Sequence, residues 1–325
     1  MNPRIERVCV LGAGVIGVSW AMLFVAAGLE VVVVDPDPAA EERFLAYAER
    51  TWPVLSRLGL AQGFAPKRVR AVRDPLEGLE GVDFVQESAP ERLELKRALI
   101  GDVDAVAPPE VVIASSSSGF GPSALAATCR YPERVIVGHP FHPVHLVPVV
   151  EVVGGSAPEW VLDTATAFYE RVGKRPVRVA VEMPGHIVNR LQAALWREAY
   201  WLLSTGAATV GDIDTAISYG PGLRWALLGP FATQHLSGGD GGLARVLEHL
   251  GPPMVEWWAD FETPRLDAEL VARATIGVAD ELAGLDQSAM EAERDQLLEM
   301  LVAAKTRAQG LPGSHPRSLA SKEPQ

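Results

Sequence analysis

The chain has 325 residues, of which 48% are hydrophobic and 22% charged, and its formal net charge at pH 7 is −12. This length and apolar content suffice for two domains with separate cores. The acidic balance argues against nucleic acid as a partner, because nucleic-acid binding needs clustered Lys and Arg to neutralise phosphates. Apolar runs fall far short of the roughly 18 residues of a membrane span, so no membrane partner is expected.

The chain contains only two cysteines, Cys9 and Cys129. Cys9 lies inside the first expected strand, which is typical of a small buried apolar residue rather than half of a disulfide. The N-terminus, MNPRIERVCVLG, lacks the long apolar segment of a signal peptide. These features predict a cytoplasmic protein in a reducing compartment.

In chain order, strand-like apolar runs first alternate with helical stretches. The expected strands are Arg7–Leu11, Glu30–Val34, Val69–Ala71, Asp83–Gln86, Val111–Ala114, Val135–Val137, Val147–Val153 and Val177–Val181. The expected helices between them are Val15–Ala27, Ala39–Arg57, Arg92–Val106 and Trp160–Val172. Such alternation predicts an α/β domain, a doubly wound parallel sheet with helices on both faces. The long crossover over residues 38–68 leaves room for a helical hairpin.

The pattern changes at Met183-Pro184-Gly185, after which helical periodicity continues without a convincing strand. The expected helices are His186–Ser204, Val210–Ser218, Leu223–Leu228, Gly242–Leu250, Pro264–Val278 and Ser288–Ala308. We therefore expect a first domain over residues 1–184 and an all-helical second domain over residues 185–312. Residues 313–325 are rich in Ser, Pro and Lys, which is typical of a disordered tail.

A glycine-rich turn, Gly12-Ala13-Gly14-Val15-Ile16-Gly17, separates the first strand from the first helix. In such a turn the first glycine allows a tight bend, the second lets a pyrophosphate approach the backbone, and the third lets the helix pack closely on the strand. The helix start adds N–H groups and the positive end of its dipole. The candidate cofactor-binding residues are Gly12, Gly14, Val15, Ile16 and Gly17. An ordinary strand-to-helix turn is the alternative.

The second expected strand ends at Asp35, 23 residues after Gly12. That is near the distance at which an acid binds the adenosine ribose hydroxyls of a dinucleotide. A carboxylate there would repel a 2′-phosphate. Asp35 therefore predicts NAD rather than NADP as the cofactor.

His139 comes directly after the expected strand Val135–Val137, at an edge where open α/β sheets bind ligands. A histidine accepts a proton near neutral pH, as the oxidation of an alcohol by NAD requires. Glu151, on the following strand, is the candidate partner that would orient the imidazole and stabilise its charged form. A structural histidine is the alternative for His139 taken alone.

Three histidines, His139, His142 and His145, recur at a spacing of three and raise the alternative of a metal site. Two prolines interrupt this segment, and no nearby Asp, Cys or Glu spacing matches a metal motif. We therefore expect no bound metal.

Two further polar segments are candidates for substrate contacts. Residues 115–118 are four consecutive serines at the end of an apolar run, where one hydroxyl would bind the substrate or the nicotinamide ribose. Asn189 opens the first long helix of the second domain, where its amide would donate to a substrate oxygen. A flexible polar loop and a helix-capping amide are the respective alternatives.

Together these segments resemble the 3-hydroxyacyl-CoA dehydrogenase family over about residues 5–250. The resemblance rests on the glycine turn, the serine loop, His139-Pro-Phe-His-Pro, Glu151 and Pro184-Gly-His-Ile-Val-Asn-Arg. It implies an N-terminal Rossmann domain, a helical domain that dimerises, and NAD-dependent oxidation of an L-3-hydroxy group to a ketone. The residue roles that it implies are His139 as base, Glu151 as its partner, Ser118 and Asn189 as substrate-orienting residues, and Glu91 and Lys96 near the cofactor.

Within the family, Gln86-Glu-Ser-Ala-Pro-Glu-Arg and Gly222-Leu-Arg-Trp resemble the branch acting on free 3-hydroxy acids, which includes L-carnitine dehydrogenase and L-gulonate 3-dehydrogenase (lambda-crystallin). Two positions depart from the family pattern. His142 replaces an Asn at a position that would face the nicotinamide, and His186 replaces a Phe. Both replacements bear on substrate choice.

Two other functions stay open. A 3-hydroxyacyl-CoA substrate would need basic groups for its long anionic ligand, for which Arg43, Arg50, Lys67 and Arg68 are candidates. A non-catalytic NAD-binding protein, like a lens crystallin, is the alternative of another class.

Overall fold

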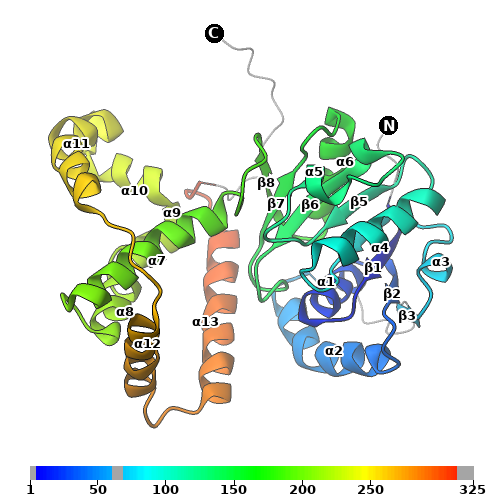
Figure 1. The fold of residues 1–325 in the computed structure, drawn as a ribbon, viewed down its shortest axis with the longest axis horizontal. Helices are drawn as coiled ribbons and strands as arrows, with labels where there is room; N and C mark the ends of the chain where they lie inside the picture. The colour runs from blue at the N-terminus through cyan, green and yellow to red at the C-terminus, as the bar shows by residue number, and fades with distance from the viewer. Residues whose placement is uncertain (1–4, 61–68, 313–325) are drawn as a thin grey trace. The chain divides into compact units, whose positions relative to one another are not determined.

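The structure is a computed structural model that describes residues 5–60 and 69–312 (Figure 1). The chain divides into two compact units, residues 1–190 and residues 191–325. The expected disordered tail, residues 313–325, and the second half of the expected helical hairpin lie outside the described residues. In the described part of that crossover there is one helix, α2 (Ala40–Arg57).

The first unit is built on one eight-stranded sheet in the order β3-β2-β1-β4-β5-β6-β7-β8. Its strands are β1 (Arg7–Leu11), β2 (Glu30–Val34), β3 (Val69–Val72), β4 (Phe84–Glu87), β5 (Val112–Ser115), β6 (Val135–Pro140), β7 (Val149–Val153) and β8 (Arg175–Val179). The first six strands are parallel to one another, whereas β7 pairs antiparallel with β6. The expected all-parallel sheet is therefore wrong at β7 and β8, which are parallel to each other and run opposite to the first six strands. The connection over residues 141–148 is short, and a short connection joins antiparallel strands, whereas a parallel pair needs a longer crossover.

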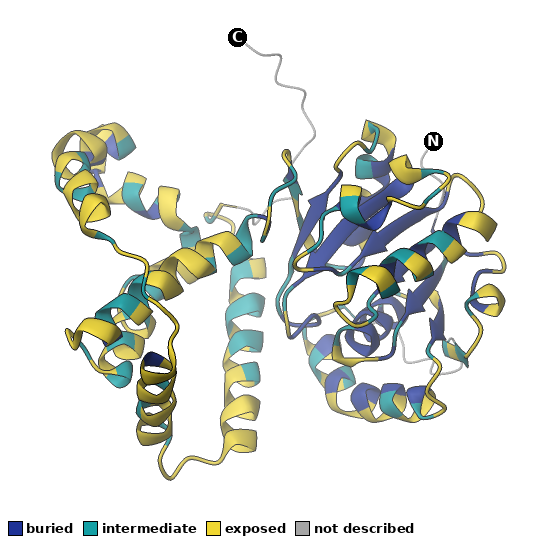
Figure 2. Ribbon diagram, viewed as in Figure 1, coloured by how far each residue is buried: buried dark blue, intermediate teal, exposed yellow. Residues whose placement is uncertain are grey.

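Helices cover both faces of this sheet, which confirms the doubly wound α/β class. They are α1 (Val15–Ala26), α2, α3 (Pro75–Gly78), α4 (Leu93–Val106), α5 (Pro122–Leu125) and α6 (Glu159–Arg171). Side chains alternate along β1, so that Val8 and Val10 join the core under α1, α2 and α6, while Cys9 and Leu11 join the core under α4. Figure 2 shows the central strands mostly buried, whereas the edge strands β3 and β8 are largely intermediate or exposed. Because both sheet faces are covered, the ends of the strands are where ligands have access.

The second unit is helical, as expected, and its first helix begins at the end of the first unit. The helices are α7 (Val188–Thr205), α8 (Val210–Ser218), α9 (Pro221–Leu228), α10 (Pro230–Ser237), α11 (Gly242–Asp260), α12 (Ala268–Glu281) and α13 (Gln287–Arg307). The sequence-based prediction missed α10 and ended α11 ten residues early, because Pro252 and Pro253 usually break helices.

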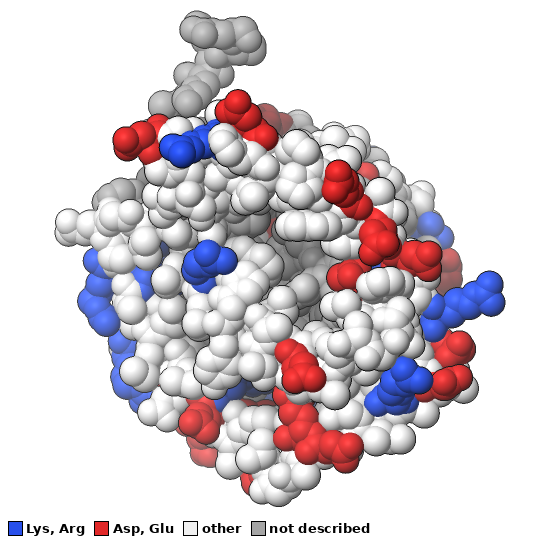
Figure 3. Space-filling view, turned by 90° about the vertical axis from the view of Figure 1, so that its left-hand side faces the viewer, with Lys and Arg blue, Asp and Glu red and all other residues white. Residues whose placement is uncertain are grey.

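Many large apolar side chains of this unit are exposed, among them Tyr219 at 81% and Phe231 at 73%. Uncharged side chains dominate the face shown in Figure 3, with acidic and basic side chains scattered among them. None of the helices in the described part of the chain is both long and apolar enough to cross a membrane.

Candidate active site

The glycine turn has the geometry that a dinucleotide requires. Gly12 has a φ of 97°, and a Cβ there would lie 2.8 Å from the Ser88 carbonyl oxygen, so only glycine fits. A Cβ at Gly17 would lie 1.8 Å from the Gly12 carbonyl oxygen. At Gly14, in contrast, a Cβ would have no atom of the described residues within 4 Å beyond its chain neighbours and its own helix. The space beside Gly14 and the start of α1 is therefore open, as the approach of a pyrophosphate requires.

Asp35 lies just after β2, where its carboxylate accepts two backbone hydrogen bonds. Its Oδ2 accepts from the Ala13 amide at 2.6 Å and its Oδ1 accepts from the Asp37 amide at 2.9 Å. A carboxylate has about four acceptor sites, so two remain for the hydroxyls of a ribose. Asp35 and the glycine turn are thus in direct contact, and their residues fit the adenosine and pyrophosphate portions of NAD.

His139 and Glu151 form a cross-strand pair. His139 lies inside β6, which runs three residues further than expected, and faces Glu151 directly in the register of β7. Its Nδ1 is 2.8 Å from Glu151 Oε2, and both side chains are buried. The contact to Nδ1 leaves Nε2 as the ring nitrogen that can exchange a proton with a ligand.

The other oxygen of Glu151 is also occupied. Glu151 Oε1 accepts hydrogen bonds from the amides of Ile187 and Val188, at 2.7 and 2.9 Å. Burial alone would raise the pKa of Glu151, but the hydrogen bonds from His139 and from these amides outweigh it and hold the pKa below its usual value. The carboxylate is therefore ionised and fixed from two sides.

The serine loop after β5 is held by Glu91. Glu91 Oε1 accepts hydrogen bonds from the Ser117 hydroxyl at 2.7 Å, the Ser118 amide at 3.0 Å and the Gly119 amide at 2.9 Å. Burial would raise the pKa of Glu91, but these bonds and the charge of Lys96 hold the pKa below its usual value. Ser118 itself is exposed, with its amide anchored. Glu91 thus fixes the backbone from which the Ser118 side chain projects.

Lys96 lies beneath this loop in a buried ion cluster. Its Nζ is 2.9 Å from Glu87 Oε1 and 3.3 Å from Glu91 Oε2, and the residue is 1% exposed. Protein groups enclose the Lys96 ammonium, so Lys96 would act on a cofactor indirectly, through its ion pair with Glu91.

Asn189 and His142 lie at the borders of this region. Asn189 is in the first turn of α7, next to Val188, whose amide binds Glu151, and is half-buried. His142 is exposed, two residues after the end of β6. Backbone amides at the start of α7 therefore contact Glu151 of the His139–Glu151 pair, and Asn189 follows directly after them.

Sequence reasoning noted His186 only as a departure from a motif and missed its environment. Its φ of 49° is the single positive value of a non-glycine residue in the part of the chain that the structure describes. The residue is 1% exposed, its ring centroid is 5.6 Å from that of His139, and its Nε2 lies 3.4 Å from the Ser117 carbonyl oxygen. Its buried Nδ1 has no hydrogen-bond partner among the described residues. Burial and the neighbouring His139 lower the pKa of His186, so the ring is neutral near pH 7.

Lys174 gave no signal in the sequence, because a lysine between helix and strand is typical of a surface residue. It is buried, and its Nζ donates to the carbonyl oxygens of Val144 at 2.8 Å and Val147 at 2.6 Å. Burial lowers the pKa of Lys174 to about 7. The side chain therefore holds the connection between His139 on β6 and Glu151 on β7.

The three spaced histidines have different surroundings. His139 binds Glu151, whereas His145 Nδ1 is 2.9 Å from the Tyr47 hydroxyl. Within residues 5–60 and 69–312, no three His, Cys, Asp or Glu side chains gather as metal ligands do.

Comparison with known proteins agrees with this geometry. Residues 7–183 match the NAD-binding domain of 3-hydroxyacyl-CoA dehydrogenase, and residues 185–283 match its C-terminal domain. The chain belongs to the 3-hydroxyacyl-CoA dehydrogenase family. It is therefore an NAD-dependent dehydrogenase that acts on a CH–OH group. The two matched domains meet at residues 183–185, close to the limit of the two compact units at residues 190–191.

Several curated relatives align along almost the whole chain. An L-carnitine dehydrogenase of Streptomyces coelicolor is 46% identical over 90% of this chain and 92% of its own length. One of Bacillus cereus is 42% identical over 92% of each chain. The crystal structure of the NAD⁺-dependent dismutase 5-formyl-3-hydroxy-2-methylpyridine 4-carboxylic acid 5-dehydrogenase aligns with a TM-score of 0.80, 28% identity, and coverage of 95% of this chain and 100% of its own.

Proposed function

We propose that this family member is an L-3-hydroxy acid dehydrogenase, related in activity to L-carnitine dehydrogenase, that oxidises a 3-hydroxyl to a 3-ketone. The observation that carries the proposal is the buried His139–Glu151 pair, with Nε2 of His139 left for a substrate. The relatives named L-carnitine dehydrogenase support the free acid as substrate.

In the proposed reaction the substrate loses a hydride from C3 and a proton from its 3-hydroxyl, and each goes to a different acceptor. Nε2 of His139 takes the proton of the 3-hydroxyl as the C=O bond forms. NAD would be held by the glycine turn and Asp35, and it would supply the acceptor for the hydride that leaves C3. The ionised Glu151 stabilises the imidazolium that results, and it keeps the ring oriented while the proton is held.

Further residues are proposed to position the reactants. The Ser118 hydroxyl and the Asn189 amide would orient the substrate oxygens, and Glu91 would hold Ser118 in place through the loop backbone. Lys96 would act through its ion pair with Glu91. His142 would face the nicotinamide side of the site.

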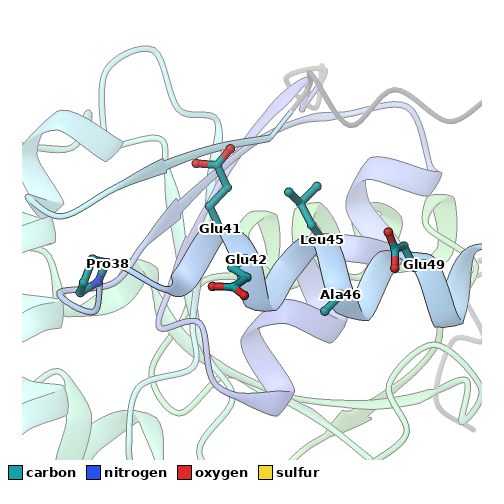
Figure 4. Close-up of a pocket in the computed structure, with 6 residues that line it drawn as sticks. All are labelled: Pro38, Glu41, Glu42, Leu45, Ala46 and Glu49. Carbon is teal, nitrogen blue, oxygen red and sulfur yellow. The ribbon is translucent and has the colours of Figure 1, made fainter.

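The surroundings of α2 favour a free acid over a CoA ester. Arg43 forms ion pairs with Asp35 and Asp37, and the Cζ atom of Arg50 lies 5.9 Å from the centroid of the Tyr47 ring. Lys67 and Arg68 lie outside the described residues. A cavity of about 480 Å³ along α2 is lined by Pro38, Glu41, Glu42, Leu45, Ala46 and Glu49, and Figure 4 shows its three carboxylates projecting from the helix. Carboxylates at this place oppose the binding of an anionic CoA tail.

The second unit carries exposed tryptophans that suit a quaternary ammonium substrate. Trp196, Trp225, Trp257 and Trp258 are each between 41% and 61% exposed. Aromatic faces attract such cations by about 0.5–2 kcal/mol. The same exposed apolar side chains would serve a homodimer interface, and we propose a cytoplasmic homodimer with domain limits at residues 184 and 312.

The function is tested by following NADH absorbance with L-carnitine, L-gulonate, L-3-hydroxybutyrate and 3-hydroxybutyryl-CoA. We expect turnover of a free acid, with a higher kcat/KM for 3-hydroxybutyrate than for its CoA ester. A preference for the ester would reverse the substrate assignment. NAD binding without turnover of any member of the panel would support a non-catalytic role instead.

A further inference from the structure

Ala13, between the first two glycines of the turn, is held through both of its backbone polar groups. Its N–H donates to Asp35 Oδ2 at 2.6 Å, and its carbonyl oxygen accepts a hydrogen bond from Arg43 Nε at 3.2 Å. Asp35 follows β2, whereas Arg43 projects from the first turn of α2. Two separate elements therefore fix one residue of the turn.

The same guanidinium connects the two acids that follow β2. One terminal nitrogen of Arg43 bonds Asp37, and the other lies 3.5 Å from Asp35 Oδ1. Two carboxylates two residues apart would repel each other, and a cation between them removes that repulsion. Arg43 thereby stabilises the position of Asp35 as well as that of the turn.

The turn needs this support because of its composition. Ala13 stands between Gly12 and Gly14, and glycines leave the unfolded or unbound backbone many conformations. A loop that must order when a ligand binds weakens the affinity, and one that is already ordered does not. Gly14, the residue after Ala13, borders the open space described above.

We propose that Arg43 is a positioning residue for the dinucleotide: it holds the Ala13 backbone and Asp35 in the arrangement that the pyrophosphate and the adenosine ribose require. The sequence had suggested Arg43 as a contact for CoA, and its partners assign it to the cofactor side instead. The inference rests on NAD binding at this turn, which its test checks separately. Arg43 leaves the reacting atoms untouched, so it acts on cofactor affinity and not on the chemical step.

The test compares Arg43→Gln with Arg50→Gln, which removes the same charge from the same helix at a position over Tyr47. Calorimetric titration should give a dissociation constant about tenfold higher for NAD and for ADP-ribose in Arg43→Gln, as expected for loss of charge-assisted hydrogen bonds. Nicotinamide mononucleotide, which lacks the adenosine and one of the two phosphates, should lose less affinity than NAD does. kcat at saturating NAD should stay the same, and the affinity of Arg43→Lys should lie between those of Arg43→Gln and the unchanged protein.

Hydrogen exchange provides a readout that needs no ligand. The amides of residues 12–16 should exchange faster in Arg43→Gln than in Arg50→Gln, while the amides of β4 should exchange alike in both. Equal NAD affinity in Arg43→Gln and the unchanged protein, or an equal loss in both glutamine variants, would overturn the proposal. If the unchanged protein bound no NAD, both this proposal and the proposed NAD-dependent function would be wrong.

Discussion

The two compact units differ in how far each buries its own apolar side chains. In the sheet-bearing unit Trp20, Phe84 and Tyr169 are fully buried. Among the described residues after 190, the buried apolar side chains are only Leu203, Val246 and Leu270, whereas large ones such as Phe231 are exposed. Contiguous exposed apolar surface usually marks a place of association. The helical unit thus leaves far more of its large apolar side chains exposed than the sheet unit does.

The difference extends to the polar groups of the site. The backbone amides that donate to Asp35, Glu91 and Glu151 all belong to residues of the first unit. A carboxylate that is fixed on two sides within a packed core is pre-organised, since no further chain needs to order it. We therefore expect substitutions in the first unit to change chemistry and cofactor binding, and matched substitutions in the helical unit to change neither.

The largest effect is expected for His139→Asn. Asparagine preserves a polar side chain opposite Glu151 but cannot take a proton near neutral pH, so kcat should fall about 10³-fold, within the range typical of a lost general base. The dissociation constant of NAD should stay the same, because His139 lies on β6 and the glycine turn follows β1. Single-turnover absorbance and calorimetry measure the two quantities, and full activity in this variant would reject His139 as the base.

A change in pH dependence is expected for Lys174→Met. The folded pKa of Lys174 is about 7 and its ordinary value is 10.5. Between these values the unfolded chain binds more protons, so the free energy of unfolding of the unchanged protein rises with pH there, by up to about 1.4 kcal/mol per pH unit. Below pH 7 both states hold the proton, and this contribution to the slope disappears.

Methionine removes both the titration and the two donors to the turn carbonyls. Urea unfolding between pH 7 and 10 should therefore show a flatter profile for Lys174→Met, and lower stability near its upper end. Lys305→Met, at a half-buried lysine of α13 that donates to the Ala226 carbonyl oxygen, serves as the control from the helical unit. An unchanged slope in Lys174→Met would show that this lysine is not held in a buried, weakly basic state.

The sequence predicted the architecture of the sheet unit well, because its evidence is local. Apolar runs, glycines with separate steric roles, and an acid at the end of β2 each act within a few residues of chain. The antiparallel direction of β7 and β8 was missed, since an apolar run of that length looks the same in either direction. The prediction ended α11 too early because prolines usually break helices, whereas Pro252 and Pro253 lie within one continuous helix.

Other features of the site depend on contacts between distant segments. His139 and Glu151 were chosen as partners from chemistry, and their separation of 2.8 Å follows from the β6–β7 register. The amides of Ile187 and Val188 donate to the second oxygen of Glu151. They carry no sequence signal, because any residue except proline has an amide N–H. The same holds for the carbonyl groups around Lys174. Such backbone partners become visible only once the chain is folded.

The smallest effect is expected for His186→Phe, which introduces the residue that the family resemblance implies at this position. The buried Nδ1 has no partner among the described residues, and removing an unsatisfied buried polar atom should raise the free energy of unfolding at pH 7.5 by about 1 kcal/mol. The pKa of His186 is lowered in the folded state, so the unfolded chain binds its proton more readily. The stability of the unchanged protein should therefore decline as the pH falls below about 6.5, and this part of the decline should vanish in the variant.

Urea unfolding at pH 5.5 and 7.5 measures both parts of this prediction. His249→Phe, at an exposed histidine of α11, removes the same ring from the helical unit and should leave both values unchanged. Equal stabilities of His186→Phe and the unchanged protein at both pH values would mean that Nδ1 is satisfied after all. A gain in stability with a loss of kcat would instead show that the neutral imidazole is kept beside His139 for its chemistry, at the expense of packing.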